Sequence, residues 1–571
     1  MAQQENNFEE ESRMLEEVQG KNFITRYKTY FKLSGPGWLQ SALTLGGGSL
    51  TGSLYLGVMT GFSMLWLQPV AMLFGIIMLF AIGYVTLASN QRPFHAINEH
   101  INPMLGWGWA VGSILSCVVW IMPQFALGTA VVQQNLLPGV FGAASPLGGF
   151  VSKLIIAAIL LSITLSIAWN YGKGTRGVRL FETVLKVLVA IVVVSFLGVV
   201  FRLMFVGDSI EWGAVFKGLI PNPALIFRPA DGLMPMLDQL SATSAAYWSD
   251  LIVGKQQEVM AAALSSAVGI NATFLFAYSM LRRKWGTEYQ GMLKFELGIG
   301  MLIPFMLATS CIIIASASQF HTVPHAVFTE RGEVDWEPDQ TQLNQYNQML
   351  ENRVLHEYGD AGLSGQQISG LAEELSEGDH LVAATLVTRD AFDLASALQP
   401  LLGGIFSGLI FGIGVLGMAV STITLHMTIA GFVICEVLKL PYESWAYRAG
   451  TLIPACGVLG VFFWDQALFW LAIPTSVITL MLLPIAYVAF LLMINNKAIM
   501  GKHRPAGGRR ILWNVLMLSV ILLVGSASMY MLWQYAGWWG MGVLGLFLTG
   551  IAVTDWQKRK KNMIHEQSTS K

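Results

Sequence analysis

Long apolar runs separated by short polar connections dominate the chain from about residue 34 to residue 553. Most of these runs are roughly 20 residues long, which is the length of an α-helix that crosses a bilayer. We therefore predict an all-α polytopic membrane protein with about 12 transmembrane helices. The predicted spans are approximately 34–61, 62–88, 106–134, 151–169, 180–205, 259–281, 292–316, 401–438, 446–463, 468–494, 511–535 and 538–553.

The polar segments between the spans predict the domain organisation. Its parts are an N-terminal cytoplasmic segment (1–33), helices one to seven (34–318), an extracytoplasmic acidic insert (319–396), helices eight to twelve (397–555) and a basic cytoplasmic tail (556–571). The insert is interpreted as a solvated, partly helical cap, with a cation-attracting vestibule as the alternative. The apolar patch Leu237–Ile252 is interpreted as a surface helix or lid, because Asp238, Asp250 and Lys255 crowd it.

Basic residues in the short loops predict the orientation in the membrane, since such loops are enriched in Lys and Arg on the cytoplasmic side. With twelve spans, the basic clusters after spans four, six, ten and twelve fall on the same side as the N-terminus. These clusters are Lys173, Arg176 and Arg179; Arg282, Arg283 and Lys284; Lys497, Lys502, Arg504, Arg509 and Arg510; and Lys558–Lys561. We therefore predict a multi-pass protein of the cell (inner or plasma) membrane with both termini cytoplasmic and no cleaved signal peptide.

Two of the predicted spans contain an interruption in their apolar pattern. The first has three glycines in a row, which cost a helix roughly 3 kcal/mol relative to alanine. The sixth is broken near Gly269. Breaks that open each set of five spans are the signature of an inverted five-plus-five repeat with a substrate site between them. The predicted substrate-binding residues are Gly46, Gly47, Gly48, Ser49, Ile270, Asn271, Ala272 and Thr273. Close helix packing and hydrogen bonds between helices are the alternative explanation.

Polar side chains within the eighth span are candidates for binding a coupling ion. Ser421, Thr422 and Thr424 supply hydroxyl oxygens, which suit a hard cation such as Na⁺. Alternatively, these hydroxyls bond back to the preceding helical turn, as is common in membrane helices. His426 is a functional candidate because it is ionisable and lies inside a span, with a satisfied packing residue as the alternative.

Composition excludes several classes of function. Charged residues make up 12% of the chain and the formal net charge is −1, so we predict no nucleic-acid partner. The four cysteines are scattered through apolar runs without a CxxC spacing, and neither a metal site nor a disulfide is predicted. The sequence has no HExxH motif and no paired aspartates within the spans, and we expect neither an enzyme nor a cofactor. The expected partners are a small inorganic ion or solute and the lipid bilayer.

Four stretches carry a resemblance to a known family. They are GPGWLQSALTLGGGSLTGSLYLGVMTGFSMLW, LQPLLGGIFSGLIFGIGVLGMAVSTITLHMTIAG, LIPACGVLGVFF and LLPIAYVAFLLMINNKAIMG. They resemble the first, eighth, ninth and tenth helices of the Nramp (natural resistance-associated macrophage protein) divalent-metal transporters. The resemblance runs from about Ser34 to Gln534 outside the insert, and it implies the LeuT-type fold.

The sequence departs from this family at the positions that bind metal. The family's DPGN motif, whose Asp and Asn ligate metal, lines up with Gly46–Ser49, and its Met-Pro-His lines up with Ile270–Ala272. The acidic pair of its third helix lines up with Met122 and Phe125. The soft thioether ligand is therefore absent, no metal ligand is assigned, and the family's acidic proton route is missing. The Glu at the start of the fifth helix is matched by Glu182.

These observations predict an Nramp-related secondary transporter that moves a divalent metal cation by alternating access. We expect it to be a symporter. One alternative is the same fold repurposed for another small solute or an anion, with Na⁺ coupling through Ser421 and Thr422. In that case the N–H groups of Gly47 and Gly48 hold the anion at a half-helix N-terminus. The other alternative is a non-transporting sensor or scaffold in which the insert is the working part. Two broken helices argue against it, because a scaffold does not need them.

Overall fold

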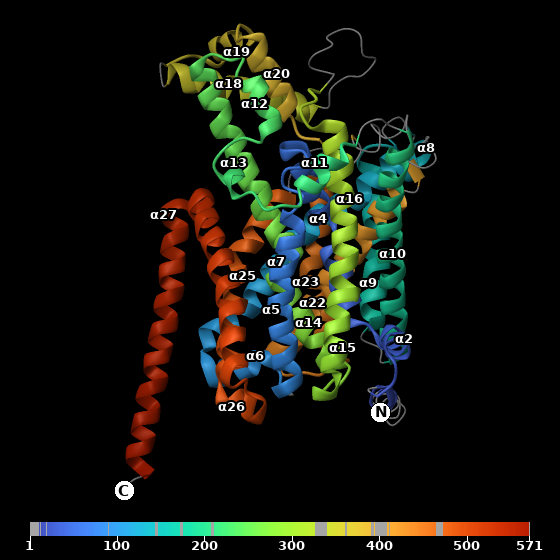
Figure 1. Ribbon diagram of the computed structural model, residues 1–571, viewed down its shortest axis with the longest axis vertical. Coiled ribbons are helices and arrows are strands. Elements are labelled where there is room, and N and C mark those ends of the chain that lie inside the picture. The colour runs from blue at the N-terminus through green and yellow to red at the C-terminus, as the bar shows by residue number, and fades with distance from the viewer. Residues whose placement is uncertain are drawn as a thin grey trace.

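The computed structural model is a bundle of long helices with a smaller group of helices at one end (Figure 1). It describes residues 11–569 except 12, 19, 90, 143–144, 146, 172–174, 207–209, 326–339, 360–361, 390–392, 394–407, 410 and 464–471. The side chains of 175–179, 206, 340–341, 463 and 561–569 also lie outside the description. Every regular element in the described part is a helix. Part of the predicted acidic insert falls outside the description, as do residues 173–174 and the side chains of 175–179 in the predicted basic loop.

Two consecutive sets of five spans form the bundle, and each set opens with a broken helix. The first set is α3 (Pro36–Thr44) with α4 (Gly47–Thr60), α5 (Leu67–Ser89), α7 (Pro103–Val131), α9 (Phe150–Tyr171) and α10 (Thr175–Val206). The second set is α13 (Ala242–Ala267) with α14 (Ile270–Arg282), α15–α16 (Gln290–Phe320), α22 (Phe411–Val437), α23–α24 (Trp445–Phe463) and α25 (Ala472–Asn495). The predicted all-α, five-plus-five organisation is confirmed.

The last two predicted spans form one continuous element, α27 (Gly507–Thr569), which reverses direction at Gly537. The φ of Gly537 is 49°, a left-handed conformation that glycine adopts without steric cost. Nine helical segments in the described residues are long and apolar enough to cross a membrane. That number falls below twelve because α27 is counted once and because α3, α4 and α23 have only 9, 14 and 11 residues.

Wide apolar faces lie on the outside of the bundle. Exposed aliphatic and aromatic side chains line α9, α10 and α27, among them Leu154, Ile159, Val194, Phe201 and Leu546. Soluble monomers rarely expose contiguous apolar patches of more than a few hundred Å². Helices with such faces are stable in lipid, because a helix makes its backbone hydrogen bonds internally. The chain is therefore a multi-pass membrane protein.

The sixth span is longer than the sequence predicted. α13 begins at Ala242, where the Ser241 hydroxyl accepts a hydrogen bond from the Ser244 backbone N–H at 3.3 Å. The predicted surface helix Leu237–Ile252 is thus not separate: most of it is the outer part of α13. Its apolar residues Trp248 and Ile252 are buried by other protein segments, which explains why an apolar patch lies among charged residues.

The segments that bury this outer part of α13 form the cap seen at the top of Figure 1. The cap consists of α12 (Met234–Leu237), α18 (Gln340–Tyr358), α19 (Gly365–Glu373) and α20 (Glu377–Leu386), which share a hydrophobic core with α13. The indole N–H of Trp248 donates to Asp379 Oδ1 at 2.7 Å, and Arg353 Nη2 donates to Ser244 Oγ at 2.8 Å. These buried polar contacts fasten the cap to the helix that carries the second break.

The packing of the cap is expected to lose stability as pH falls because of His325, which follows α16 and donates its backbone N–H to the Ala384 carbonyl of α20 at 3.0 Å. Burial and the nearby Arg389 guanidinium lower the pKa of the His325 imidazole to about 3, whereas an unfolded histidine has a pKa of about 6.5. Between these values only the unfolded state binds the proton, so acidification favours unfolding. The apparent melting temperature of the wild-type protein should fall between about pH 7.5 and about pH 5, and it should fall less in His325→Gln. Equal pH dependence of the two proteins would contradict this assignment.

Candidate functional site

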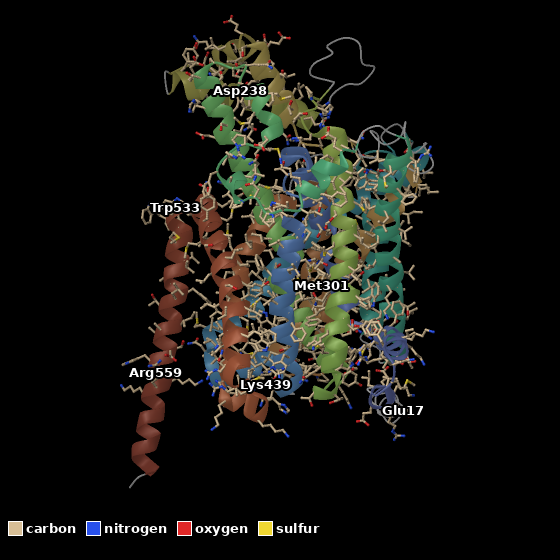
Figure 2. The ribbon with its side chains drawn as sticks, viewed as in Figure 1. Glu17, Asp238, Met301, Lys439, Trp533 and Arg559 are labelled. Carbon is tan, nitrogen blue, oxygen red and sulfur yellow. The ribbon has the colours of Figure 1, made fainter. Side chains whose placement is uncertain are left out.

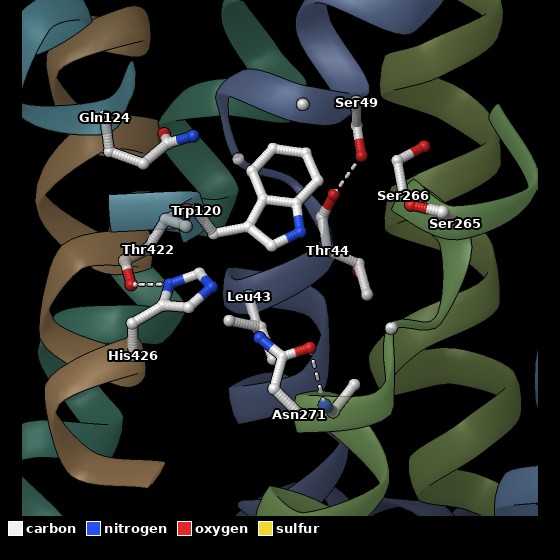
Figure 3. A pocket seen from close by; sticks show the side chains of 14 residues that line it. Leu43, Thr44, Ser49, Trp120, Gln124, Ser265, Ser266, Asn271, Thr422 and His426 are labelled. Carbon is white, nitrogen blue, oxygen red and sulfur yellow. Dashed lines mark hydrogen bonds between the residues drawn. The ribbon is translucent and has the colours of Figure 1, made fainter. Parts of the chain in front are cut away.

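The two helix breaks face one another and enclose a small cavity in the middle of the bundle (Figure 3). Its volume is about 30 Å³, which is room for one or two water molecules or a small ion. The lining residues come from α3, α4, α7, α13, α14 and α22. They are Leu43, Thr44, Gly46, Gly48, Ser49, Trp120, Gln124, Ser265, Ser266, Gly269, Asn271, Ala272, Thr422 and His426.

Glycines at the first break let neighbouring helices approach the backbone. Gly46 is extended, with φ −107° and ψ −174°, and the chain resumes as α4 at Gly47. A Cβ on Gly46 would overlap the Thr422 hydroxyl, and a Cβ on Gly48 would overlap the indole ring of Trp120. The glycine run thus does more than break the helix, because it brings α22 and α7 into contact with the break.

The Gln124 side chain closes one side of the cavity. Its Oε1 accepts a hydrogen bond from the Gly47 backbone N–H at 3.0 Å. Because a backbone N–H can only donate, this contact fixes the orientation of the amide and directs Nε2 away from Gly47. In the described part of the chain the buried Nε2 has no hydrogen-bond partner. The Gly47 N–H, which the anion hypothesis requires, therefore already donates its hydrogen bond to Gln124.

The second break lies opposite the first. Gly269 is extended, with ψ 167°, and α14 starts at Ile270. The Asn271 Oδ1 accepts from the Ala272 N–H at 3.0 Å, and the Ala272 carbonyl accepts from Gln40 Nε2 on α3 at 2.9 Å. The amide of Asn271 and the start of α14 are thus held in place beside the inner half of the first broken helix.

α22 contributes Thr422 and His426, which lie one turn apart on the face toward the cavity (Figure 3). The His426 Nδ1 is 2.6 Å from the Thr422 carbonyl oxygen. Both side chains are 2% exposed. Among the described residues, neither His426 Nε2 nor Thr422 Oγ1 has a hydrogen-bond partner.

The structure brings together only some of the residues predicted from sequence. Gly46, Gly48, Ser49, Asn271 and Ala272 line the cavity, and Gly47 lies at its edge through Gln124. Two others do not line it: the Ile270 side chain is buried elsewhere, and the Thr273 hydroxyl bonds Trp109 Nε1 at 2.9 Å.

The three coupling-ion candidates also separate. Thr422 lines the cavity, whereas the Ser421 hydroxyl donates to the Ala42 carbonyl at 3.1 Å. The Thr424 hydroxyl bonds back to the Val420 carbonyl at 2.7 Å, as the alternative explanation held. The three side chains therefore do not face one common cavity, and a role for any of them in ion coupling stays a prediction.

Sequence reasoning missed the contributions of α3, α7 and α13. Leu43 and Thr44, and Ser265 and Ser266, are the last residues before the two breaks, where helix carbonyls lack intrahelical partners. The two interruptions in the apolar pattern could have indicated these four residues. No sequence feature indicates Trp120, and the only one that indicates Gln124 is that it is a lone amide in an apolar span.

A polar network holds the N-terminus of α3 at the end of the bundle away from the cap. The Glu296 carboxylate accepts from the N–H groups of Gly35 and Gly37, each at 2.7 Å. Lys186 Nζ donates to the Ser34 carbonyl at 2.6 Å. Glu296 is fully buried, so it caps a half-helix with its charge and does not extend toward solvent.

Arg283 completes this network from the end of α14. Its Nε is 3.0 Å from Glu182 Oε1, and its Nη1 donates to the Leu33 carbonyl at 2.6 Å. Both charged side chains are buried. Residues of α10, α14 and η6 (Glu296–Leu302) therefore converge on the start of α3.

No group of three or more His, Cys, Asp or Glu side chains suited to a metal ion occurs among the described residues. None of the cavity-lining residues carries a formal charge either. Any cation in this cavity would be bound by backbone carbonyls, hydroxyls, side-chain amide oxygen and the single imidazole.

Comparison with known proteins agrees with this architecture. The chain is 28% identical over 224 residues to a manganese transporter of Schizosaccharomyces pombe, covering 38% of each chain. It is 30% identical over 156 residues to a divalent metal cation transporter of Nostoc, covering 26% of this chain and 33% of that one. These matches span less than half the length of either relative.

The fold matches solved transporters along nearly its whole length. A variant of the manganese transporter from Eremococcus coleocola superposes with a TM-score of 0.61 at 14% identity, covering 94% of this chain and 95% of that one. The same transporter bound to an aromatic bis-isothiourea compound gives 0.60 at 15% identity, with the same coverage. The model of the family described as natural resistance-associated macrophage protein-like matches residues 37–352 and 379–534. The chain therefore belongs to the Nramp family.

Proposed function

We propose that this protein carries a metal ion across the membrane by alternating access, with the ion bound in the cavity between the two breaks. One observation carries the proposal. Three lining side chains have a buried atom with a lone pair and no hydrogen-bond partner in the described part of the chain: Ser265 Oγ, Thr422 Oγ1 and His426 Nε2. An unsatisfied buried polar group costs about 1–3 kcal/mol, so a cavity with three such atoms favours a cation.

The size of the cavity and its hydrogen bonds favour an ion over the alternatives. Pockets for small organic molecules usually exceed roughly 300 Å³, about tenfold more than the 30 Å³ enclosed here. The anion alternative relies on the N–H groups of Gly47 and Gly48, and the Gly47 N–H already donates to Gln124 Oε1. The ends of α3 and α13 contribute backbone carbonyls, which suit a cation.

We place the end of the bundle away from the cap, which holds Glu182, Arg283 and Glu296, on the cytoplasmic side. Figure 2 shows Lys439 and Arg559 at this end and Asp238 at the opposite, cap end. Loops rich in Lys and Arg usually stay cytoplasmic, so both termini are assigned there. Opening toward the cytoplasm then requires the start of α3 to separate from Glu296 and Arg283.

The test is uptake by the full-length protein in liposomes, with Mn²⁺, Zn²⁺, Mg²⁺ and Na⁺ offered separately. We expect saturable uptake of at least one metal ion. Asn271→Leu should lower this uptake at least about tenfold, because an aliphatic side chain without hydrogen-bonding groups fills the cavity. The matched control is Asn170→Leu in α9, which lies outside the cavity and should transport normally. The proposal fails if the wild type moves none of the four ions, or if Asn271→Leu matches the control.

A further inference from the structure

We infer that His426 is a direct ligand of the transported ion through Nε2, and that it makes the cavity prefer first-row transition metals over Mg²⁺ and Ca²⁺. The inference rests on the proposed function, that the cavity binds a metal ion. It adds an imidazole ligand on α22 at a position where the resemblance implies no metal ligand.

The hydrogen bond of the ring defines which nitrogen faces the cavity as an acceptor. The Thr422 carbonyl oxygen can only accept, so the His426 Nδ1 at 2.6 Å from it must carry the proton. In the uncharged ring the lone pair then resides on Nε2. This atom is buried and has no partner in the described part of the chain, and the ring lies at the cavity wall (Figure 3).

This arrangement is the one found at metal-binding histidines. Such a histidine almost always donates its other ring N–H to a carboxylate, a backbone carbonyl or water, which fixes the ring and raises the basicity of the ligating nitrogen. A purely structural role for His426 explains the contact of Nδ1 with its own helix. It does not explain why Nε2 faces the cavity without a hydrogen bond. A buried polar atom without a partner costs free energy, and an aliphatic side chain at this position would avoid that cost.

Other oxygen atoms around the cavity can complete the coordination of an ion. Thr422 lies one turn before His426 on the same helical face, and its hydroxyl also has no partner within the described residues. The hydroxyl of Ser265 and the carbonyls at the end of α3 lie on the opposing wall. The absence of Cβ at Gly46 brings the first break against the Thr422 hydroxyl, so the α22 ligands and the break adjoin.

The ligand types determine the expected selectivity. Mg²⁺ and Ca²⁺ take oxygen ligands and are usually bound by carboxylates, yet none of the lining residues has a carboxylate. Imidazole suits Zn²⁺, Cu²⁺, Fe²⁺ and Ni²⁺. A site without charged ligands and with one imidazole therefore distinguishes transition metals from Mg²⁺ and Ca²⁺ through its nitrogen ligand and not through its charge.

Pulsed EPR on the purified full-length protein with Mn²⁺ tests the ligand directly, because a coordinated imidazole gives a characteristic ¹⁴N modulation. We expect this modulation in the wild type and in His356→Gln, which removes an exposed histidine of the cap. We expect its loss in His426→Gln, whose amide can still donate to the Thr422 carbonyl. Thr422→Val should retain the modulation and bind Mn²⁺ more weakly, because only an oxygen ligand is removed.

Binding measurements give the second readout. His426→Gln should lower the affinity for Zn²⁺ by at least about tenfold. Loss of a residue that only supports a metal ligand already costs about that much. Mg²⁺ affinity should change much less. A wild type that binds Mn²⁺ without ¹⁴N modulation, or a His426→Gln protein with unchanged selectivity, overturns the inference while the proposed function stands. A wild type that binds no metal ion overturns both.

Discussion

Arg283→Met is expected to lower the free energy of unfolding by about 3–5 kcal/mol, because it leaves the buried Glu182 carboxylate without its partner. Arg283 contacts both Glu182 and the Leu33 carbonyl, and methionine can replace neither contact. A large drop in the apparent melting temperature of the detergent-solubilised protein would show the effect.

The matched control for this change is Arg509→Met. Arg509 is exposed and lies over the Tyr84 ring, with 5.4 Å from its guanidinium carbon to the ring centroid. Its replacement should alter stability by no more than about 1 kcal/mol, the usual strength of such a contact at an exposed site. If Arg283→Met and Arg509→Met melt alike, the network at the start of α3 does not hold the bundle together.

Gly48→Ala is expected to reduce ion uptake at least tenfold while lowering the free energy of unfolding by only about 1–3 kcal/mol. A Cβ at this position overlaps the Trp120 ring, so the indole must move at the wall of a cavity of only about 30 Å³. Overpacking of this kind costs about 1–3 kcal/mol, and 1.4 kcal/mol corresponds to about a tenfold change. Uptake of Mn²⁺ into liposomes measures the loss.

Two further proteins distinguish blockage from unfolding. Gly254→Ala changes a helical glycine whose Cβ would meet nothing within 4 Å, and uptake should be normal. The double variant Gly48→Ala/Trp120→Leu should recover part of the uptake, since the smaller side chain makes room for the added methyl group. A double variant no better than Gly48→Ala alone would mean that the clash with Trp120 is not the cause.

The parts of the fold that follow from local composition could be predicted. Three consecutive glycines and the break at Gly269 weaken a helix regardless of its surroundings, so their positions and the repeat they define were accessible from the sequence. The turn at Gly537 separates two apolar runs for the same kind of reason. These features need no knowledge of how the helices pack.

The remaining part of the site depends on how each helix is rotated about its axis. α22 is apolar on nearly all sides and almost fully buried, so hydrophobic periodicity cannot show which side faces the cavity. Ser421, Thr422 and Thr424 therefore looked equivalent, although only Thr422 lines it. The outer part of α13 was misassigned because its apolar face is covered by the cap, whose helices are distant in sequence.

The uncharged lining of the cavity determines which step of a transport cycle depends on the membrane voltage. No cavity-lining residue is a carboxylate that could neutralise a bound cation, so the loaded cavity would carry the full charge of the ion through the membrane field and the empty cavity would carry none. Each elementary charge gains about 2.3 kcal/mol per 100 mV of potential. A divalent ion entering a cell that is negative inside by 100 mV would thus gain about 4.6 kcal/mol, enough for more than about a thousandfold accumulation. All of this energy would be gained in the step in which the loaded cavity changes the side to which it opens.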